Sequence, residues 1–290
     1  MRHRVRCQIV SCAALFAILL MLCGFAAAQT KEDPAKGSQI PEANVPKPLP
    51  RGGPVPRTAD GHPDLSGVWF PGCYGTGDLN AFGLAGNYNL VRGCPDPKRA
   101  EPIPWQPWAA AKYKETFSSP LELQLHSPYI LCLPRGTPVS LASTPYPIQF
   151  VQTPGTIVQL NEYDWDFRII YTDGRAHSQD PDPTFNGESI GHWEGDTLVI
   201  DVIGIDERVW NNTNGWFHSD QEHVVERLTR TSENYLSYQY TIEDPKTLTK
   251  IWTSPVLTKT LGHEPLEEFY CTHTEELSQF SDQKKVLKSK

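Results

Sequence analysis

Histidine and carboxylate side chains in two stretches of the second half of the chain are the residues best suited to chemistry. His177 and Asp182 lie in the first stretch, and His218, His223 and Glu226 lie in the second. Imidazole and carboxylate groups hold divalent metals and carry protons in acid–base catalysis. We therefore expect catalysis, if the chain has any, from His177, Asp182, His218 or His223, and a divalent metal, if one binds, at His177, His218, His223 and Glu226.

A second group of residues suits ligand binding. The chain holds 8 Trp, 11 Tyr and 11 Phe residues, and aromatic rings either contact apolar ligands or fill a protein core. Trp193 and Trp210 are candidates to line a cavity mouth, with a core position as the alternative. Arg135 either reaches the same mouth or caps a loop carbonyl. With His223 and Arg227 they form the predicted ligand-binding set.

The elements that must position these side chains are β-strands. From Ile148 onward, apolar runs alternate with turn dipeptides such as Pro154-Gly155 and Asp173-Gly174, which favour hairpins. One helix is expected, over Pro107–Glu115, where proline occupies the first turn. The expected strands are Ile148–Thr153, Thr156–Tyr163, Trp165–Thr172, Ser189–Trp193, Thr197–Gly204, Val224–Thr231, Tyr235–Glu243, Lys250–Thr260 and Leu266–Cys271.

Consecutive hairpins of this number predict a mainly β fold, a closed antiparallel up-and-down barrel. No amphipathic helix separates the strands, so a parallel sheet is not expected. Leu236, Tyr238, Tyr240 and Ile242 alternate with polar positions, as a barrel wall requires. We expect an irregular segment over residues 64–147, the barrel over 148–276 and a flexible tail over 277–290.

The register of the strand near His223 decides which side chains meet. If the strand already includes His223, then His223 and Arg227 share one face and Glu226 lies on the other. In that case His223 and Arg227 project into the barrel, where an arginine needs a carboxylate or an anionic ligand. The metal set converges only if His223 still lies in a loop. A structural ion pair and a ligand contact both stay open.

The amino terminus has the pattern of a secretory signal. Arg2, Arg4 and Arg6 precede an apolar run, and Ala26-Ala27-Ala28 supplies small residues for cleavage before Gln29. We therefore expect a signal peptide over residues 1–28, export to the periplasm or beyond, and no stable membrane insertion after cleavage. Residues 29–63 are rich in proline and predict a disordered tether.

Four cysteines remain after residue 28: Cys73, Cys94, Cys132 and Cys271. An even number in an exported chain predicts two disulfides, and four cysteines allow three pairings. We favour Cys73–Cys94 and Cys132–Cys271. A four-cysteine metal site is the alternative, but no Cys-x-x-Cys pair is present.

The charge of the chain disfavours two classes of partner. The net charge is −8, and removal of residues 1–28 takes away three arginines and no acid, which leaves −11. Proteins that coat nucleic acid or anionic membranes usually carry the opposite sign. We therefore expect a small-molecule partner and no nucleic acid.

Four stretches of the chain carry a resemblance to known proteins: residues 146–155, 168–175, 189–201 and 218–227. Together they resemble a family of secreted bacterial proteins of unknown function with a lipocalin-like barrel. The run Gly-x-Trp-x-Gly-Asp-Thr-Leu-Val, which begins at Gly191, is also similar to other calycin-type barrels. The resemblance spans about residues 60–275, implies the fold and the compartment, and brings no catalytic residue. The expected function is therefore small-molecule binding in a barrel cavity, and the alternative is a hydrolase or lyase with a His/carboxylate site at the barrel mouth.

Overall fold

The computed structural model describes residues 49–71, 101–116, 126–129, 131–142, 146–212 and 215–271. The predicted signal peptide, the first part of the predicted tether, Cys73, Cys94 and the predicted tail lie outside the described residues. No helix in the described ranges is long and apolar enough to cross a membrane.

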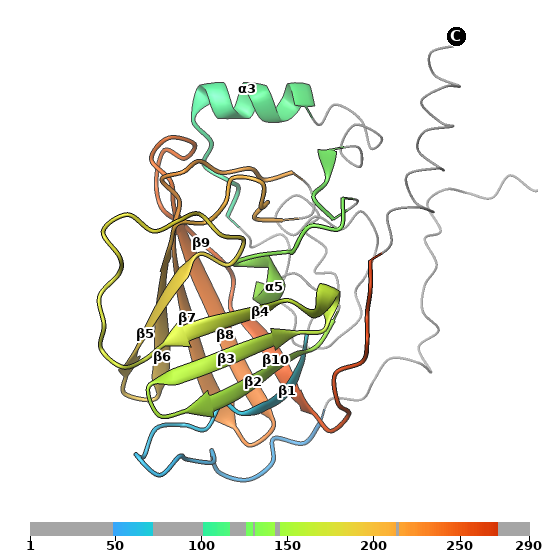
Figure 1. Cartoon of the computed structure of the whole chain (residues 1–290), viewed down its shortest axis with the longest axis vertical. Coiled ribbons are helices and arrows are strands. Elements are labelled where there is room, and N and C mark those ends of the chain that lie inside the picture. Colours follow the sequence, from blue (N-terminus) through green and yellow to red (C-terminus); the bar gives the residue numbers. More distant parts are fainter. Residues whose placement is uncertain are drawn as a thin grey trace, which may run out of the picture. The chain divides into compact units, whose positions relative to one another are not determined.

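Ten strands and two α-helices make up the described elements (Figure 1). The helices are α3 (Pro107–Thr116) and α5 (Val139–Ala142), and a short 3-10 turn, η3, covers Tyr163–Trp165. The strands are β1 (Gly67–Pro71), β2 (Ile148–Thr153), β3 (Thr156–Asn161), β4 (Phe167–Tyr171), β5 (Glu188–Glu194), β6 (Thr197–Ile203), β7 (His223–Ser232), β8 (Tyr235–Glu243), β9 (Trp252–Thr253) and β10 (Leu257–Gly262).

The sheet closes on itself. Strand β10 pairs with β1 on one side and with β8 on the other, so nine strands form a ring and β9 continues from β8 outside it. The prediction of a mainly β chain with a closed barrel is confirmed, and the architecture is consistent with a calycin-like fold. The expected helix and the expected strands over residues 148–153 and 235–243 are also confirmed.

The barrel is not purely antiparallel, and that part of the prediction is wrong. Strands β4 and β5 run parallel, with Ile170 opposite Ser189 and Tyr171 opposite Ile190. Parallel neighbours need a long crossover, and residues 172–187 supply one without a helix. The absence of a crossover helix therefore did not exclude a parallel pair.

Two further expectations about the strands differ from the structure. The expected strand over Lys250–Thr260 is split into β9 and β10, and Leu266–Cys271 forms no strand. Strand β1 was not expected, although it supplies the partner that closes the ring on β10. Its five residues lie within the segment that the sequence presented as irregular.

The alternation along β8 fixes the inner wall. Leu236, Tyr238, Tyr240 and Ile242 are buried, as predicted, while the residues between them are partly exposed. Three tryptophans, Trp69, Trp216 and Trp252, are fully buried in the same core. Burying a large apolar side chain contributes roughly 1.5–3 kcal/mol, so this core is the main support of the barrel.

The last part of the predicted tether contacts the barrel. The Tyr235 hydroxyl donates to the carbonyl of Leu49, and Asn234 Nδ2 donates to Pro50 O over 3.0 Å. Arg57 makes two hydrogen bonds to Asp196, at 2.8 and 2.9 Å. Residues 49–63 are thus held along the barrel, while the limits of the predicted domains stay predictions.

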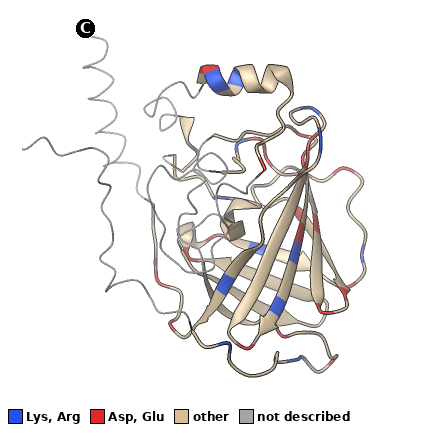
Figure 2. Ribbon diagram, turned by 180° about the vertical axis from the view of Figure 1, so that it is seen from behind, with Lys and Arg blue, Asp and Glu red and all other residues tan. Residues whose placement is uncertain are grey.

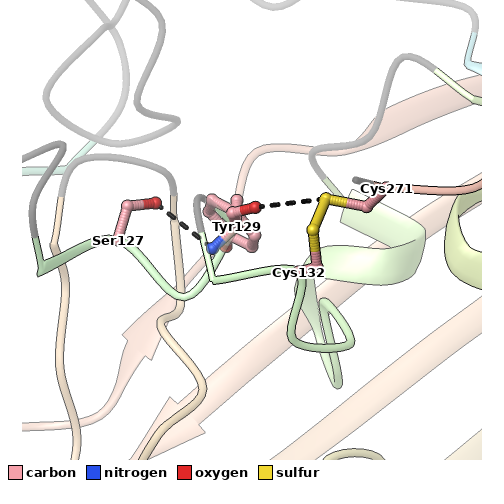
Figure 3. The surroundings of a disulfide bond; sticks show 4 residues. All are labelled: Ser127, Tyr129, Cys132 and Cys271. Atoms are coloured by element: carbon pink, nitrogen blue, oxygen red, sulfur yellow. Dashed lines mark hydrogen bonds between the residues drawn. A yellow bond between two sulfur atoms is a disulfide. The ribbon is translucent and has the colours of Figure 1, made fainter. Parts of the chain in front are cut away.

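A disulfide joins Cys132 to Cys271, with 5.5 Å between the Cα atoms (Figure 3). Cys271 Sγ also lies 3.8 Å from the carbonyl oxygen of Tyr129. This pair confirms one of the two favoured disulfides. The other, Cys73–Cys94, lies outside the described residues.

Charged residues occur on the strands as well as in the loops (Figure 2). Lys259 on β10 pairs with Leu236, whose side chain faces the core, so Lys259 faces the interior as well. It is 3% exposed, and within the described residues no hydrogen bond or opposite charge acts on its ammonium group. Burial lowers the pKa of Lys259 to about 7.

Replacing Lys259 by methionine should stabilise the protein at neutral pH. The lowered pKa means that folding is penalised as pH falls from about 10.5, the ordinary value, toward 7. The penalty at pH 7 is about 4 kcal/mol, at 1.36 kcal/mol per pKa unit. Denaturant unfolding at pH 7 should show a free energy of unfolding about 4 kcal/mol higher for Lys259→Met than for the parent. At pH 10.5 the difference between the two proteins should be smaller, because the lysine is then partly neutral in the unfolded chain as well.

The exposed Lys250, which pairs with Glu101, is the matched control. Lys250→Met should change the free energy of unfolding by less than about 1 kcal/mol at either pH. A Lys259→Met variant no more stable than the parent at pH 7 would show that the interior accommodates the charged ammonium.

Candidate functional site

A buried ion pair crosses the barrel interior. Arg168 on β4 donates from Nη2 to Glu226 Oε2 on β7 over 2.5 Å, and its Nε donates to Ser189 Oγ on β5 over 2.7 Å. Tyr238 on β8 donates to the other oxygen of Glu226 over 2.7 Å. Arg168 is 2% exposed and Glu226 is fully buried. Four strands therefore converge on one polar group inside the barrel.

The two faces of β7 are the reverse of the expectation. The strand begins at His223, so His223 and Glu226 do point to opposite faces, as the alternation predicts. Glu226 and Arg230 are the buried residues, whereas Arg227 is exposed and donates to Glu194 over 2.7 Å. The expectation that His223 and Arg227 project into the barrel is wrong, because Val224 and Leu228 bury the opposite face.

An open cleft of about 480 Å³ lies at the seam between β4 and β5. The two strands share only two paired positions, so the wall is interrupted beside Phe167 and Arg168. The buried residues Arg168 and Ser189 line the cleft. The exposed side chains of Phe167 and Ile169 line it as well. The cleft thus lies beside the interior ion pair, whose two side chains stay buried.

Two buried polar atoms at this cleft have no hydrogen-bond partner in the described part of the chain: Arg168 Nη1 and Asn186 Oδ1. The amide of Asn186 is oriented by its Nδ2, which donates to Asp166 Oδ2 over 2.8 Å. Burial raises the pKa of Asp166 above its ordinary value. Buried polar groups are nearly always paired, so these atoms mark a position where a ligand or water belongs.

A row of histidine and carboxylate groups runs across the outer face at one end of the barrel. The Asp201 carboxylate accepts hydrogen bonds from two imidazoles: from His177 Nε2 over 2.9 Å and from His223 Nε2 over 3.0 Å. His177 Nδ1 lies 2.8 Å from Glu188 Oε2, and Glu243 lies 3.8 Å from His223. The bond to Asp201 raises the pKa of His223, and the same bond holds the pKa of Asp201 down.

The remaining candidates of the predicted metal set lie elsewhere. Glu226 is inside the barrel, and His218 is buried beside Glu222, with 3.7 Å between His218 Nδ1 and Glu222 Oε1. Among the described residues, no three His, Cys, Asp or Glu side chains are grouped so that they could hold a metal ion. The structure brings His177 and His223 together but does not bring His218 or Glu226 to them.

The other predicted site residues are dispersed. Asp182 lines the seam cleft. Trp193 stacks on His62 at 4.8 Å, and Trp210 is buried in a small cluster with Ala109. Arg135 lies over the rings of Tyr129 and Tyr163, at 4.6 and 4.3 Å. A ligand-binding role for His223, Arg227, Trp193, Trp210 and Arg135 stays a prediction.

Sequence reasoning did not select Asp166, Asn186, Ser189 or Glu222. Ser189 lies in the stretch 189–201 that carries the family resemblance, and its neighbours in the sequence give no sign of an arginine partner. The usable signal was the interior face of β7, which carries Glu226 between Val224 and Leu228. A carboxylate between two apolar inward positions requires a cationic partner on another strand.

Loss of one partner of the interior pair should be far more harmful than loss of a surface pair. Glu226→Gln leaves Arg168 charged and buried, and such a loss costs about 3–5 kcal/mol. Glu194→Gln removes the partner of Arg227, an exposed pair that is worth less than about 1 kcal/mol. Chemical denaturation of both variants measures the difference, and equal effects would contradict an ion pair shielded from water.

Comparison with known proteins adds no assignment: no family model matches this chain, and no curated protein or solved structure matches it significantly.

Proposed function

We propose that the protein is an exported small-molecule-binding protein whose ligand occupies the seam cleft between β4 and β5. The observation that carries the proposal is that Arg168 lines the cleft and that its buried guanidinium has an Nη1 with no hydrogen-bond partner within the described chain. A closed barrel supplies a rigid frame for such a site. Membership in the lipocalin-like family that the sequence resembles is part of the same proposal.

The lining defines the chemistry of the ligand. Arg168 Nη1 offers a donor and Asn186 Oδ1 offers an acceptor. Because Glu226 already balances the charge of Arg168, the ligand needs a hydrogen-bond acceptor there rather than a full negative charge. Phe167, Ile169 and Phe185 add apolar surface at the rim. A small, partly apolar molecule with one donor and one acceptor suits this cleft.

Removal of the Phe167 ring should weaken binding without harming the fold. Phe167 is 59% exposed, so its truncation costs little stability. The probe 8-anilinonaphthalene-1-sulfonate carries an aromatic body, an N–H donor and acceptor oxygens. We expect one saturable site by fluorescence titration, and a loss of about fivefold or more in Phe167→Ala from the lost apolar contact.

Ile251→Ala is the matched control, since Ile251 is 53% exposed and does not line the cleft. Equal dye binding by parent and Phe167→Ala, or an equal loss in Ile251→Ala, would refute the seam cleft as the site. Native mass spectrometry of protein purified from its source then identifies the molecule that co-purifies.

A hydrolase or lyase is the second candidate function, and one observation favours it. Two of its four predicted catalytic residues, His177 and His223, converge on the two oxygens of Asp201. An imidazole oriented by a carboxylate is suited to general-base catalysis. This row of side chains lies next to the seam cleft, because Ser178 donates a hydrogen bond to Glu188 of the row and both residues line that cleft.

Ester hydrolysis tests this second function. If the row is catalytic, p-nitrophenyl acetate and butyrate should be turned over, and His223→Gln should lower kcat by about a hundredfold or more. His192→Gln is the control, because His192 is an exposed imidazole on β5 whose one ion pair within the described residues is with Glu194. Equal rates in both variants would exclude a catalytic His223.

A further inference from the structure

A second cleft, of about 670 Å³, lies on the other side of the crossover segment from the seam cleft. Residues of the β6–β7 connection and of the crossover line it, and Pro181 lines both clefts. Its lining includes Glu222, which is only 3% exposed. A buried carboxylate is therefore at the inner wall of an open depression.

Five buried polar atoms at and behind this wall have no hydrogen-bond partner within the described chain. They belong to residues of the 211–222 segment and to Tyr240 on β8: Asn211 Oδ1, Trp216 Nε1, His218 Nε2, Glu222 Oε1 and Tyr240 OH. Trp216 and Tyr240 both pack on Trp252, at 4.9 and 5.7 Å between ring centroids. Such a concentration of unpaired groups is rare in a protein interior and requires a partner.

Two of the five atoms are acceptors, and the contacts of their side chains show this. Asn211 Nδ2 donates to Glu222 Oε2, which leaves Asn211 Oδ1 as an acceptor. Glu222 Oε1 is the second acceptor. His218 Nδ1 lies 2.9 Å from the carbonyl oxygen of Ser219 and donates to it, which orients the ring beside Glu222.

Most charged residues that line the cleft are acidic, as Glu222 is. Asp206 and Asp220 line it and are balanced by Arg208 and Lys246. Asp180 and Glu207 also line it and form no ion pair within the described chain. The cleft is therefore rich in carboxylate, and Glu222 brings an oxygen without a hydrogen-bond partner to its wall.

We propose that this second cleft binds a small organic cation that carries N–H donors, such as a primary ammonium or an amidinium, with Glu222 at its wall as the acceptor. His218 and Asn211 contact Glu222 from behind the wall and hold its carboxylate in place. Burial raises the pKa of Glu222 to about 6. An adjacent cation would stabilise the carboxylate and offset that desolvation. The site goes beyond the seam cleft, since it uses different residues and does not depend on Arg168.

Acetamidinium and tetramethylammonium are the test probes, because both are small cations and only the first has N–H donors. At pH 7.5, isothermal titration calorimetry should show acetamidinium binding at one site and no comparable binding of tetramethylammonium. Glu222→Gln should weaken acetamidinium binding by about tenfold or more, the size of a lost charge-assisted hydrogen bond. Asp220→Asn, at the exposed part of the same cleft, should stay within about twofold.

Several results would overturn the proposal. They are the absence of saturable acetamidinium binding, equal affinity for tetramethylammonium, and equal losses in Glu222→Gln and Asp220→Asn. The last result would mean a general acidic field rather than a built site. If Glu222→Gln does not fold, the indole N–H resonance of Trp216 in the parent decides: it should shift with acetamidinium, and an unmoved resonance means that only water fills the wall.

Discussion

The Arg168–Glu226 pair removes two ions from water at the centre of the barrel. Two buried charges are costly, and their attraction repays the cost only when the remaining polar atoms are also satisfied. Ser189 and Tyr238 supply that satisfaction from two further strands. The register of β4 against β5 and of β7 against β8 therefore has to be kept, because a shift of one residue would turn Arg168 or Glu226 to the outside.

The parallel seam beside this pair is the least regular part of the barrel wall. Antiparallel hairpins elsewhere pair along most of their length, as β7 and β8 do from His223 to Ser232. The seam has only two paired positions, and the crossover segment that joins β4 to β5 lines the cleft beside it. Pro181 of that segment also lines the second cleft, so the least regular connection of the barrel contributes to both depressions.

Much of the fold could be predicted from local signals. Pro154-Gly155 predicted a hairpin that the structure contains, because a turn depends on its own residues. Asp173-Gly174 also favoured a hairpin, and that expectation is wrong, since the next strand, β5, runs parallel to β4. The parallel seam could not be predicted this way, since residues 172–187 carry no helical pattern. The partner of Glu226 lies 58 positions away, at Arg168, and one sequence gives no measure of which strands meet. The apolar residues Val224 and Leu228 indicate which face of β7 points inward, whereas the prediction placed His223 and Arg227 on that face.

The Cys132–Cys271 bridge spans a separation of 139 residues and encloses every strand from β2 to β10. The crossover between β4 and β5 lies inside this covalent loop. A protease that cuts the exposed residues near Arg175 would therefore leave one covalently joined molecule. The two fragments would separate on a denaturing gel only after reduction, so that the bridge keeps both halves of a nicked barrel at high local concentration for reassembly.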